Sequence, residues 1–162
     1  MAWLYVVLML LVGCAAELTP YALELDEEAL GVEYAHVASD AAAVWEARTG
    51  LAVFSDVDAK PLRVTAFAGA CVSVDDGRPL YGQFNPNTDQ ISFCRSSMEA
   101  ESKSTSYAHA VLMHELGHAL GLDHSDDAHN LMHATTPANW TISDAQIEQI
   151  KSTVQGARVL SY

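Results

Sequence analysis

The most informative segment of this chain reads His114-Glu115-Leu116-Gly117-His118-Ala119-Leu120-Gly121-Leu122-Asp123-His124. On a helix, His114 and His118 would lie one turn apart on the same face. Two imidazole nitrogens placed in this way can bind one zinc ion. Gly121 predicts the end of that helix, because glycine adopts backbone angles that other residues avoid. The chain can then turn sharply and return His124 as a third ligand.

This ligand set predicts a catalytic zinc site rather than a structural one. Three neutral imidazoles from His114, His118 and His124 leave a fourth coordination position for water, as catalytic zinc sites do. Glu115 directly follows the first ligand, so we expect it to act as the catalytic base. It would take a proton from the attacking water and pass it to the leaving amine. Such a site needs no serine or cysteine nucleophile.

The same segment resembles the elongated zinc motif of the metzincin proteases. Ser125, directly after the third histidine, is similar to the matrixin branch, the matrix-metalloprotease-like group. The resemblance implies a zinc-dependent endopeptidase that acts on protein or peptide substrates. Metzincins also carry a tight turn with a methionine beneath the zinc, and this implies that role for Met132. A plain core methionine is the alternative at that position.

The resemblance extends over roughly residues 30 to 155. The segments Tyr81–Pro86 and Ile91–Phe93 resemble the matrixin edge strand and the strand after it. In that family the edge strand pairs with extended substrate, which adds a strand to an open sheet edge. Residues 34–48 match the backing helix and 143–154 the C-terminal helix. The implied fold is α+β: a metzincin-like catalytic domain with a mixed twisted sheet and a backing, an active-site and a C-terminal helix.

Local patterns in the sequence predict the same elements. Apolar residues at helical spacing favour a helix over 34–48, and Gly50 is a plausible stop. Thr105 or Ser106 could cap a second helix that runs to Leu120, and Ser143 with Gln146 predicts a capping box for the last one.

Residues 95–104 are predicted to form an exposed loop. Strands are predicted at 51–54, 62–67, 71–74, 80–84 and 90–94, and weakly at 21–25. This order favours an α+β fold with a mixed or antiparallel sheet.

The composition limits the kinds of partner that the chain can bind. The 162 residues suit one domain, and a hydrophobic content of 50% suffices for a buried core. The formal net charge of −13 argues against a nucleic acid partner and against electrostatic attraction to anionic lipids. We interpret the acidity as a solubilising surface. We expect the domain to be a monomer.

The N-terminus indicates export. Ala2–Val12 is apolar but too short to span a bilayer, which takes roughly 20 residues, so 1–13 reads as a signal peptide. Leu11-Val12-Gly13-Cys14 resembles the lipobox of bacterial lipoproteins, in which the cysteine receives lipid; cleavage after Ala16 is the alternative. The chain has 3 cysteines, so a lipidated Cys14 would leave Cys71 and Cys94 to form a disulfide.

These features predict three segments and a location. They are a signal peptide at 1–13, an acidic approach segment at 14–33 and a catalytic domain at 34–162. The expected location is extracytoplasmic, as a lipoprotein anchored through Cys14 to the outer membrane or cell surface of a bacterium, or otherwise secreted. The alternative function is a catalytically inactive zinc-binding surface lipoprotein that serves as an adhesion or interaction module. Intact Glu115 favours the enzyme, because a binding module has no need of it.

Some family features are not recognisable in the sequence. We find no propeptide with a cysteine switch and no histidine and aspartate spacing for the matrixin structural zinc. Asp75-Asp76-Gly77 reads as a turn, and calcium stays unsupported because that ion needs six or more oxygen ligands. His133 stands where matrixins usually place a tyrosine, and it could line the specificity pocket or be a plain loop histidine. No role is assigned to His36, His109 and His129.

Overall fold

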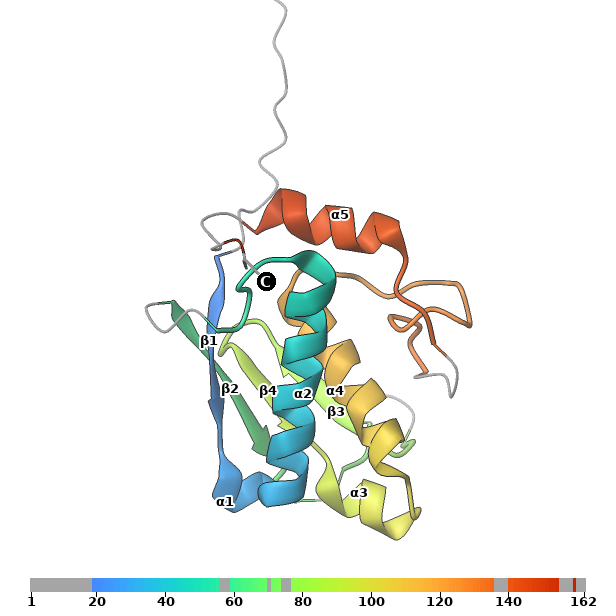
Figure 1. Cartoon of the computed structure of the whole chain (residues 1–162). Coiled ribbons are helices and arrows are strands. Elements are labelled where there is room, and N and C mark those ends of the chain that lie inside the picture. The colour runs from blue at the N-terminus through green and yellow to red at the C-terminus, as the bar shows by residue number, and fades with distance from the viewer. Residues whose placement is uncertain are drawn as a thin grey trace, which may run out of the picture.

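The computed structural model describes residues 19–55, 59–69, 71–73, 77–135, 140–154 and 159. The predictions for the signal peptide, for Cys14 and for Asp75-Asp76 therefore lie outside the described residues. Figure 1 shows one sheet with the two longest helices, α2 (Val32–Thr49) and α4 (Thr105–Ala119), side by side over one face. The last helix, α5 (Asp144–Thr153), lies across the C-terminal ends of both. This is the α+β architecture expected from the sequence.

The sheet is mixed and has four strands in the order β1-β2-β4-β3. Their bounds are Tyr21–Leu25 for β1, Lys60–Ala66 for β2, Gly82–Asn85 for β3 and Gln90–Phe93 for β4. The first three strands in this order run parallel, and β3 pairs antiparallel with β4 at the far edge. The outer side of β1 is partly covered, because its backbone N–H groups donate to the carbonyls of Val53 and Phe54 at 2.9 and 3.1 Å. The open edge of the sheet is therefore β3, as the resemblance implied.

The core lies between the sheet and the two long helices. Ile91 and Phe93 from β4 are fully buried there, as are Leu112 and Leu116 from α4. Trp45 of α2 is also fully buried, and its indole N–H donates to the carbonyl of Met113 at 2.9 Å. A buried tryptophan that satisfies its N–H in this way contributes both apolar area and a fixed orientation. Trp45 therefore holds α2 against α4 at the residue that precedes His114.

The predicted helix ends are mostly confirmed. Gly50 and Gly121 have positive φ angles of 70° and 80°, which glycine adopts without strain. Ser143 and Gln146 form the expected capping box at α5. The cap of α4 is one residue earlier than predicted, because the hydroxyl of Ser104 accepts the N–H of Tyr107 at 3.2 Å.

Three predictions of local structure are wrong. Residues 95–104 are not simply an exposed loop, since they contain α3 (Arg95–Ala100), whose Met98 is fully buried in the core. Residues 51–54 form no strand of the sheet. Leu51 and Ser55 each make one isolated bridge, and so does Val72 in the described part of the predicted strand 71–74. Residues 53–55 do follow the outer side of β1, which donates hydrogen bonds to Val53 and Phe54 and bridges Ser55, but this contact is too short to form a strand of the sheet.

Two further features bear on the N-terminal segment. The short helix α1 (Glu27–Leu30) was not predicted; Asp26 caps it by accepting the N–H of Ala29 at 3.1 Å. Its other carboxylate oxygen accepts the hydroxyl of Thr65 at 3.0 Å, which fastens α1 to β2. The boundary at residue 34 stays a prediction, although β1 and α1 belong to the segment before it. None of the helices in the described ranges has the length and apolar character needed to cross a membrane.

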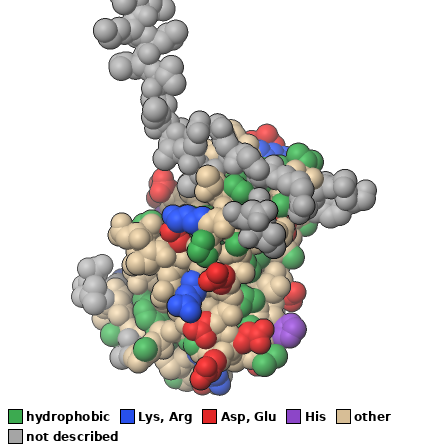
Figure 2. Space-filling view, turned by 90° about the vertical axis from the view of Figure 1, so that its left-hand side faces the viewer, with side chains coloured by type: hydrophobic (Ala, Val, Ile, Leu, Met, Phe, Trp, Pro, Cys, Tyr) green, Lys and Arg blue, Asp and Glu red, His purple; other side chains and the backbone are tan. Residues whose placement is uncertain are grey.

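The predicted disulfide between Cys71 and Cys94 is confirmed, with Cα atoms 6.0 Å apart. It joins the segment before β3 to the end of β4. Figure 2 shows the face on the β1 side, where acidic and basic side chains are interspersed and apolar ones are scattered. That distribution agrees with the interpretation of the charge as a solubilising surface.

Candidate metal centre and catalytic site

The three predicted ligands meet at the C-terminal end of α4. His114 is buried and His118 half-buried, and their Nε2 atoms are 3.0 Å apart. His124 returns after the turn at Gly121, and one nitrogen from each histidine lies within 4.8 Å of the others. The turn is closed by the N–H of Leu122, which donates to the carbonyl of Gly117 at 3.0 Å. The structure therefore brings together the ligand set that the sequence predicts.

Backbone carbonyls orient two of the imidazoles. The Nδ1 atom of His114 lies 2.8 Å from the carbonyl oxygen of Leu131, and Nδ1 of His118 lies 2.7 Å from that of Leu122. A carbonyl only accepts hydrogen bonds, so both Nδ1 atoms carry the proton and both Nε2 atoms present a lone pair. Two lone pairs that face each other at 3.0 Å repel unless a cation lies between them. This donor set fits zinc, which prefers imidazole nitrogens held by such hydrogen bonds.

Burial prepares the ligands for a metal. It lowers the pKa of His114 to about 4, although the hydrogen bond to Leu131 opposes the shift. Burial also lowers the pKa of His118, against the hydrogen bond to Leu122. Both shifts favour the neutral imidazole, which is the form that binds metal. The burial of His114 and His118 against the core thus favours the neutral form of both imidazoles.

Glu115 points from α4 toward the edge strand. Its carboxylate accepts the backbone N–H of Phe84 at 2.8 Å. Burial raises the pKa of this carboxyl to about 7, and the hydrogen bond from Phe84 opposes that rise. A carboxyl that titrates near neutral pH can both accept and return a proton, which suits a general base. Glu115 therefore lies where α4 meets the edge strand, and its role as the catalytic base stays a prediction.

Gly82 allows the close approach between β3 and α4. A Cβ atom at this position would lie 2.9 Å from Cγ of Glu115 and 2.9 Å from Cγ1 of Val111. Both distances are shorter than real Cβ atoms show, so any larger residue would push the strand away from the helix. A glycine here thus sets the distance between the edge strand and the carboxylate.

A cavity of about 310 Å³ opens beside the candidate site. It lies between the segment 78–82 and α4, and it is lined by His114, Glu115, Val111 and Thr135 among others. Glu115 contributes a carboxyl group to its lining, while Val111 contributes an apolar surface. The size and position suit a substrate side chain next to the reacting bond.

The methionine turn lies beneath α4. Met132 is fully buried, and its sulfur would be 2.5 Å from a Cβ atom at Gly117, so the glycine makes room for it. The carbonyl of Leu131, just before it, receives the hydrogen bond from His114. Asn130 holds the turn, because its side-chain oxygen accepts the N–H of Met132 at 2.8 Å. The turn at Met132 therefore packs against α4, and Leu131 within it contacts His114; the position of Met132 beneath a zinc ion stays a prediction.

Sequence reasoning missed the residues that support the site. The carbonyls of Leu122 and Leu131 carry no side-chain signal, so no motif could have indicated them. Asn130 could have been suspected, because it is a turn-forming polar residue directly before the apolar pair Leu131-Met132. His133 turns toward its own loop: its Nδ1 accepts the N–H of Thr135 at 3.3 Å. This contact favours the reading of His133 as a loop histidine.

Comparison with known proteins adds one match. A family model described as Matrixin matches residues 21–154. The matched range begins at the first residue of β1 and ends just after α5, so it contains the whole sheet, both long helices and the histidine cluster. A comparison with curated proteins finds no match for this chain.

Proposed function

The chain belongs to the matrixin family, and from this we propose that it is a zinc-dependent endopeptidase that hydrolyses peptide bonds in extracytoplasmic proteins or peptides. One observation carries the proposal. The Nε2 atoms of His114 and His118 face each other at 3.0 Å, and the buried carboxyl of Glu115 lies next to them on the same helix. The family and the histidine cluster together support a zinc metallopeptidase. The class of substrate and the cellular location are what we propose beyond that.

The chemistry follows from the residues of the chain. Zinc, when bound at His114, His118 and His124, supplies a Lewis acid that polarises a carbonyl group and makes water more acidic. Glu115 accepts a proton from the water that attacks the scissile carbonyl. It then donates that proton to the departing amine. The N–H of Phe84 holds the carboxylate in place through both steps.

We further propose that substrate binds as an added strand on β3. This strand is at the edge of the sheet, and Phe84 in it contacts Glu115. An extended peptide that pairs with β3 would gain backbone hydrogen bonds from groups of this edge other than the N–H of Phe84, which Glu115 engages, while its side chains alternate between solvent and the protein. One side chain could then enter the cavity beside Glu115 and Val111. Pairing through the backbone explains how one site could accept many sequences.

The proposed location is the bacterial envelope, with lipid on Cys14. The support comes from the sequence: the Leu11-Val12-Gly13-Cys14 segment and the pairing of Cys71 with Cys94, which uses the two other cysteines. Only seven positions separate Cys14 from Tyr21 at the start of β1 (21 − 14 = 7). At about 3.5 Å per residue such a tether reaches about 25 Å at most, so the domain would work close to the membrane. Mass spectrometry of the mature N-terminus tests this, and an unmodified Glu17 there would exclude it.

The decisive experiment is hydrolysis of casein and of a broad peptide library by the full chain. The protein is assayed as isolated, after zinc removal by a chelator, and after zinc is restored. Chelation should abolish cleavage and zinc should restore it, whereas a Glu115→Gln control should stay inactive in all three states. If the wild type binds one zinc and cuts no peptide, the non-catalytic zinc-binding lipoprotein becomes the better interpretation.

A further inference from the structure

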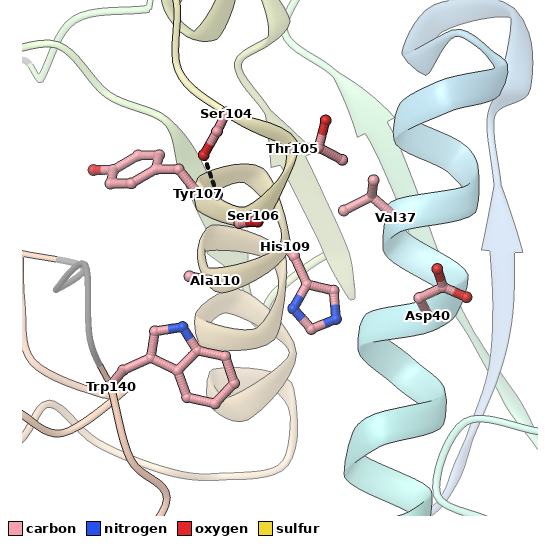
Figure 3. A pocket seen from close by; sticks show the side chains of 9 residues that line it. All are labelled: Val37, Asp40, Ser104, Thr105, Ser106, Tyr107, His109, Ala110 and Trp140. Carbon is pink, nitrogen blue, oxygen red and sulfur yellow. Dashed lines mark hydrogen bonds between the residues drawn. The ribbon is translucent and has the colours of Figure 1, made fainter.

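A second cavity lies on the other side of α4 from the candidate site. Figure 3 shows this α2–α4 cavity, which has a volume of about 400 Å³. Val37 and Asp40 of α2 form one side, the start of α4 from Ser104 to Ala110 forms the floor, and Trp140 forms the opposite side. Nothing in the proposed chemistry uses these residues.

The α2–α4 cavity is separate from the metal centre but close to it. His109 precedes His114 by five positions, which on a helix is about 7.5 Å along the axis and about 140° around it. The zinc ligands therefore face a different direction. Tyr107, however, lines both the α2–α4 cavity and the cavity beside Glu115. A peptide bound at the catalytic site could thus extend past Tyr107 and reach the second cavity.

Aromatic faces are available within it. The rings of His109 and Trp140 are nearly parallel, with an interplanar angle of 23° and centroids 6.4 Å apart. Trp140 is half-buried, so one part of its indole packs on the protein while another part faces the cavity. Tryptophan presents the best ring for a cation, and a planar guanidinium stacks on such a face better than a compact ammonium does.

The charge of the cavity is negative. Asp40 is an exposed carboxylate in its lining, and among the described residues no ion pair engages it. The described lining residues include neither lysine nor arginine. The chain as a whole carries a formal net charge of −13, so a cationic group is attracted before it arrives. A cavity that contains aromatic rings and a carboxylate favours an organic cation over an anion or an apolar side chain.

We propose that the α2–α4 cavity is a secondary binding site for an arginine side chain of a peptide. The guanidinium stacks on Trp140, and the carboxylate of Asp40, on the other side of His109, attracts it through its negative charge. Whether this peptide is also a substrate rests on the proposed peptidase function, but the binding of arginine does not depend on that function. In the active enzyme the site would favour peptides that carry arginine at a distance from the cleaved bond.

The first test measures binding alone, with zinc removed by a chelator so that no cleavage can occur. N-acetyl-arginine amide is titrated into the full chain, and N-acetyl-citrulline amide serves as the neutral analogue of the same shape. Binding is followed by the emission of Trp140, taken as the difference between wild type and Trp140→Phe. The arginine amide should bind about fivefold more tightly than the citrulline amide, the ratio expected for a partly exposed charge pair with a cation–π contact.

Single substitutions test whether Asp40 is responsible for the preference for arginine. Asp40→Asn should remove the fivefold preference for arginine, whereas Glu28→Gln, which removes one exposed negative charge from α1, should retain it. Equal binding of the two amides to the wild type, or an unchanged preference in Asp40→Asn, would overturn the proposal. If N-acetyl-lysine amide binds as tightly as the arginine amide, stacking of a planar cation is excluded.

The second test links the site to turnover and separates the two proposals. In a peptide library, Asp40→Asn should raise KM for arginine-containing peptides about fivefold and leave kcat unchanged. A chain that cuts nothing but binds arginine amide at Asp40 refutes the peptidase and keeps the binding site. A chain that cuts peptides but shows no arginine preference in either assay refutes the binding site and keeps the peptidase.

Discussion

The carboxylate of Glu115 accepts a hydrogen bond of 2.8 Å from the backbone N–H of Phe84. This contact joins the helix that carries the metal ligands to the edge strand of the sheet. The position of the proposed base and the position of the proposed substrate strand are therefore set together. Gly82 keeps the two elements this close, since a Cβ atom there would meet the side chain of Glu115 at 2.9 Å.

Glu115→Gln should abolish hydrolysis and leave zinc bound. The three histidines supply all the proposed protein ligands, and the glutamine oxygen can still accept the N–H of Phe84. Loss of general-base catalysis should lower kcat/KM by roughly a hundred- to ten-thousand-fold. Zinc content by elemental analysis, measured beside cleavage of a quenched fluorescent peptide, checks both parts. His118→Ala is the contrasting variant, because zinc and activity should fall together; near-native turnover of Glu115→Gln would refute the assigned role.

Gly117→Ala should weaken both the fold and the metal site. The added methyl group would lie 2.5 Å from the sulfur of Met132 and 3.2 Å from Cζ2 of Trp45, and both side chains are fully buried. Overpacking of this kind typically lowers the free energy of unfolding by about 1–3 kcal/mol. Displacement of the Met132 turn should also shift the carbonyl of Leu131 away from His114 and reduce zinc affinity.

Urea unfolding and zinc competition titrations measure the two effects of Gly117→Ala. Gly69→Ala is the matched control, because a Cβ atom there meets nothing within 4 Å. If Gly117→Ala behaves like that control, the turn is more adaptable than its burial indicates.

Removal of the disulfide should impair substrate binding more than the chemical step. The carbonyl of Cys71 accepts the N–H of Leu80 at 2.9 Å, and the N–H of Cys94 donates to the carbonyl of Tyr81 at 2.8 Å. The bond therefore holds the segment 78–82, which lines the cavity beside Glu115. The double variant Cys71→Ser with Cys94→Ser should lose about 3 kcal/mol of stability for a sequence separation of 23 residues.

Steady-state kinetics at a temperature where the double variant stays folded test the positioning role. KM should rise several-fold while kcat changes little. A variant that loses stability but keeps the wild-type KM would limit the disulfide to a structural role.

Tyr21 should make the fold sensitive to alkali. Burial raises its pKa to about 12, and the charge and hydrogen bond of Asp89 add to the shift. Because the folded-state pKa lies above the ordinary value of about 10, the folded chain holds this proton more tightly than the unfolded chain. The contribution of Tyr21 is therefore complete below about pH 10 and is lost as the pH rises toward 12.

Urea unfolding of wild type and Tyr21→Phe across this alkaline range checks the effect. The free energy of unfolding of the wild type should fall more steeply with pH than that of the variant. Parallel slopes would show that Tyr21 ionises as easily in the folded chain as in the unfolded one.

The sequence by itself determined the features that depend on a few neighbouring residues. The spacing of His114 and His118 places both on one face of any helix, and Gly121 permits the turn that returns His124. Ser143 and Gln146 cap α5 through contacts three residues apart. Geometry over such distances follows from backbone periodicity and steric rules, which is why these predictions are confirmed.

Only the tertiary structure decided how those residues are supported. His114 is oriented by the carbonyl of Leu131, 17 positions away, and Glu115 by the N–H of Phe84, 31 positions away. Backbone groups look alike in every sequence, so no residue pattern indicates which of them will meet. Residues 95–100 form a helix rather than a loop because this conformation buries Met98 in the core. Such burial depends on how the rest of the chain packs, and local helix or strand propensity does not predict it.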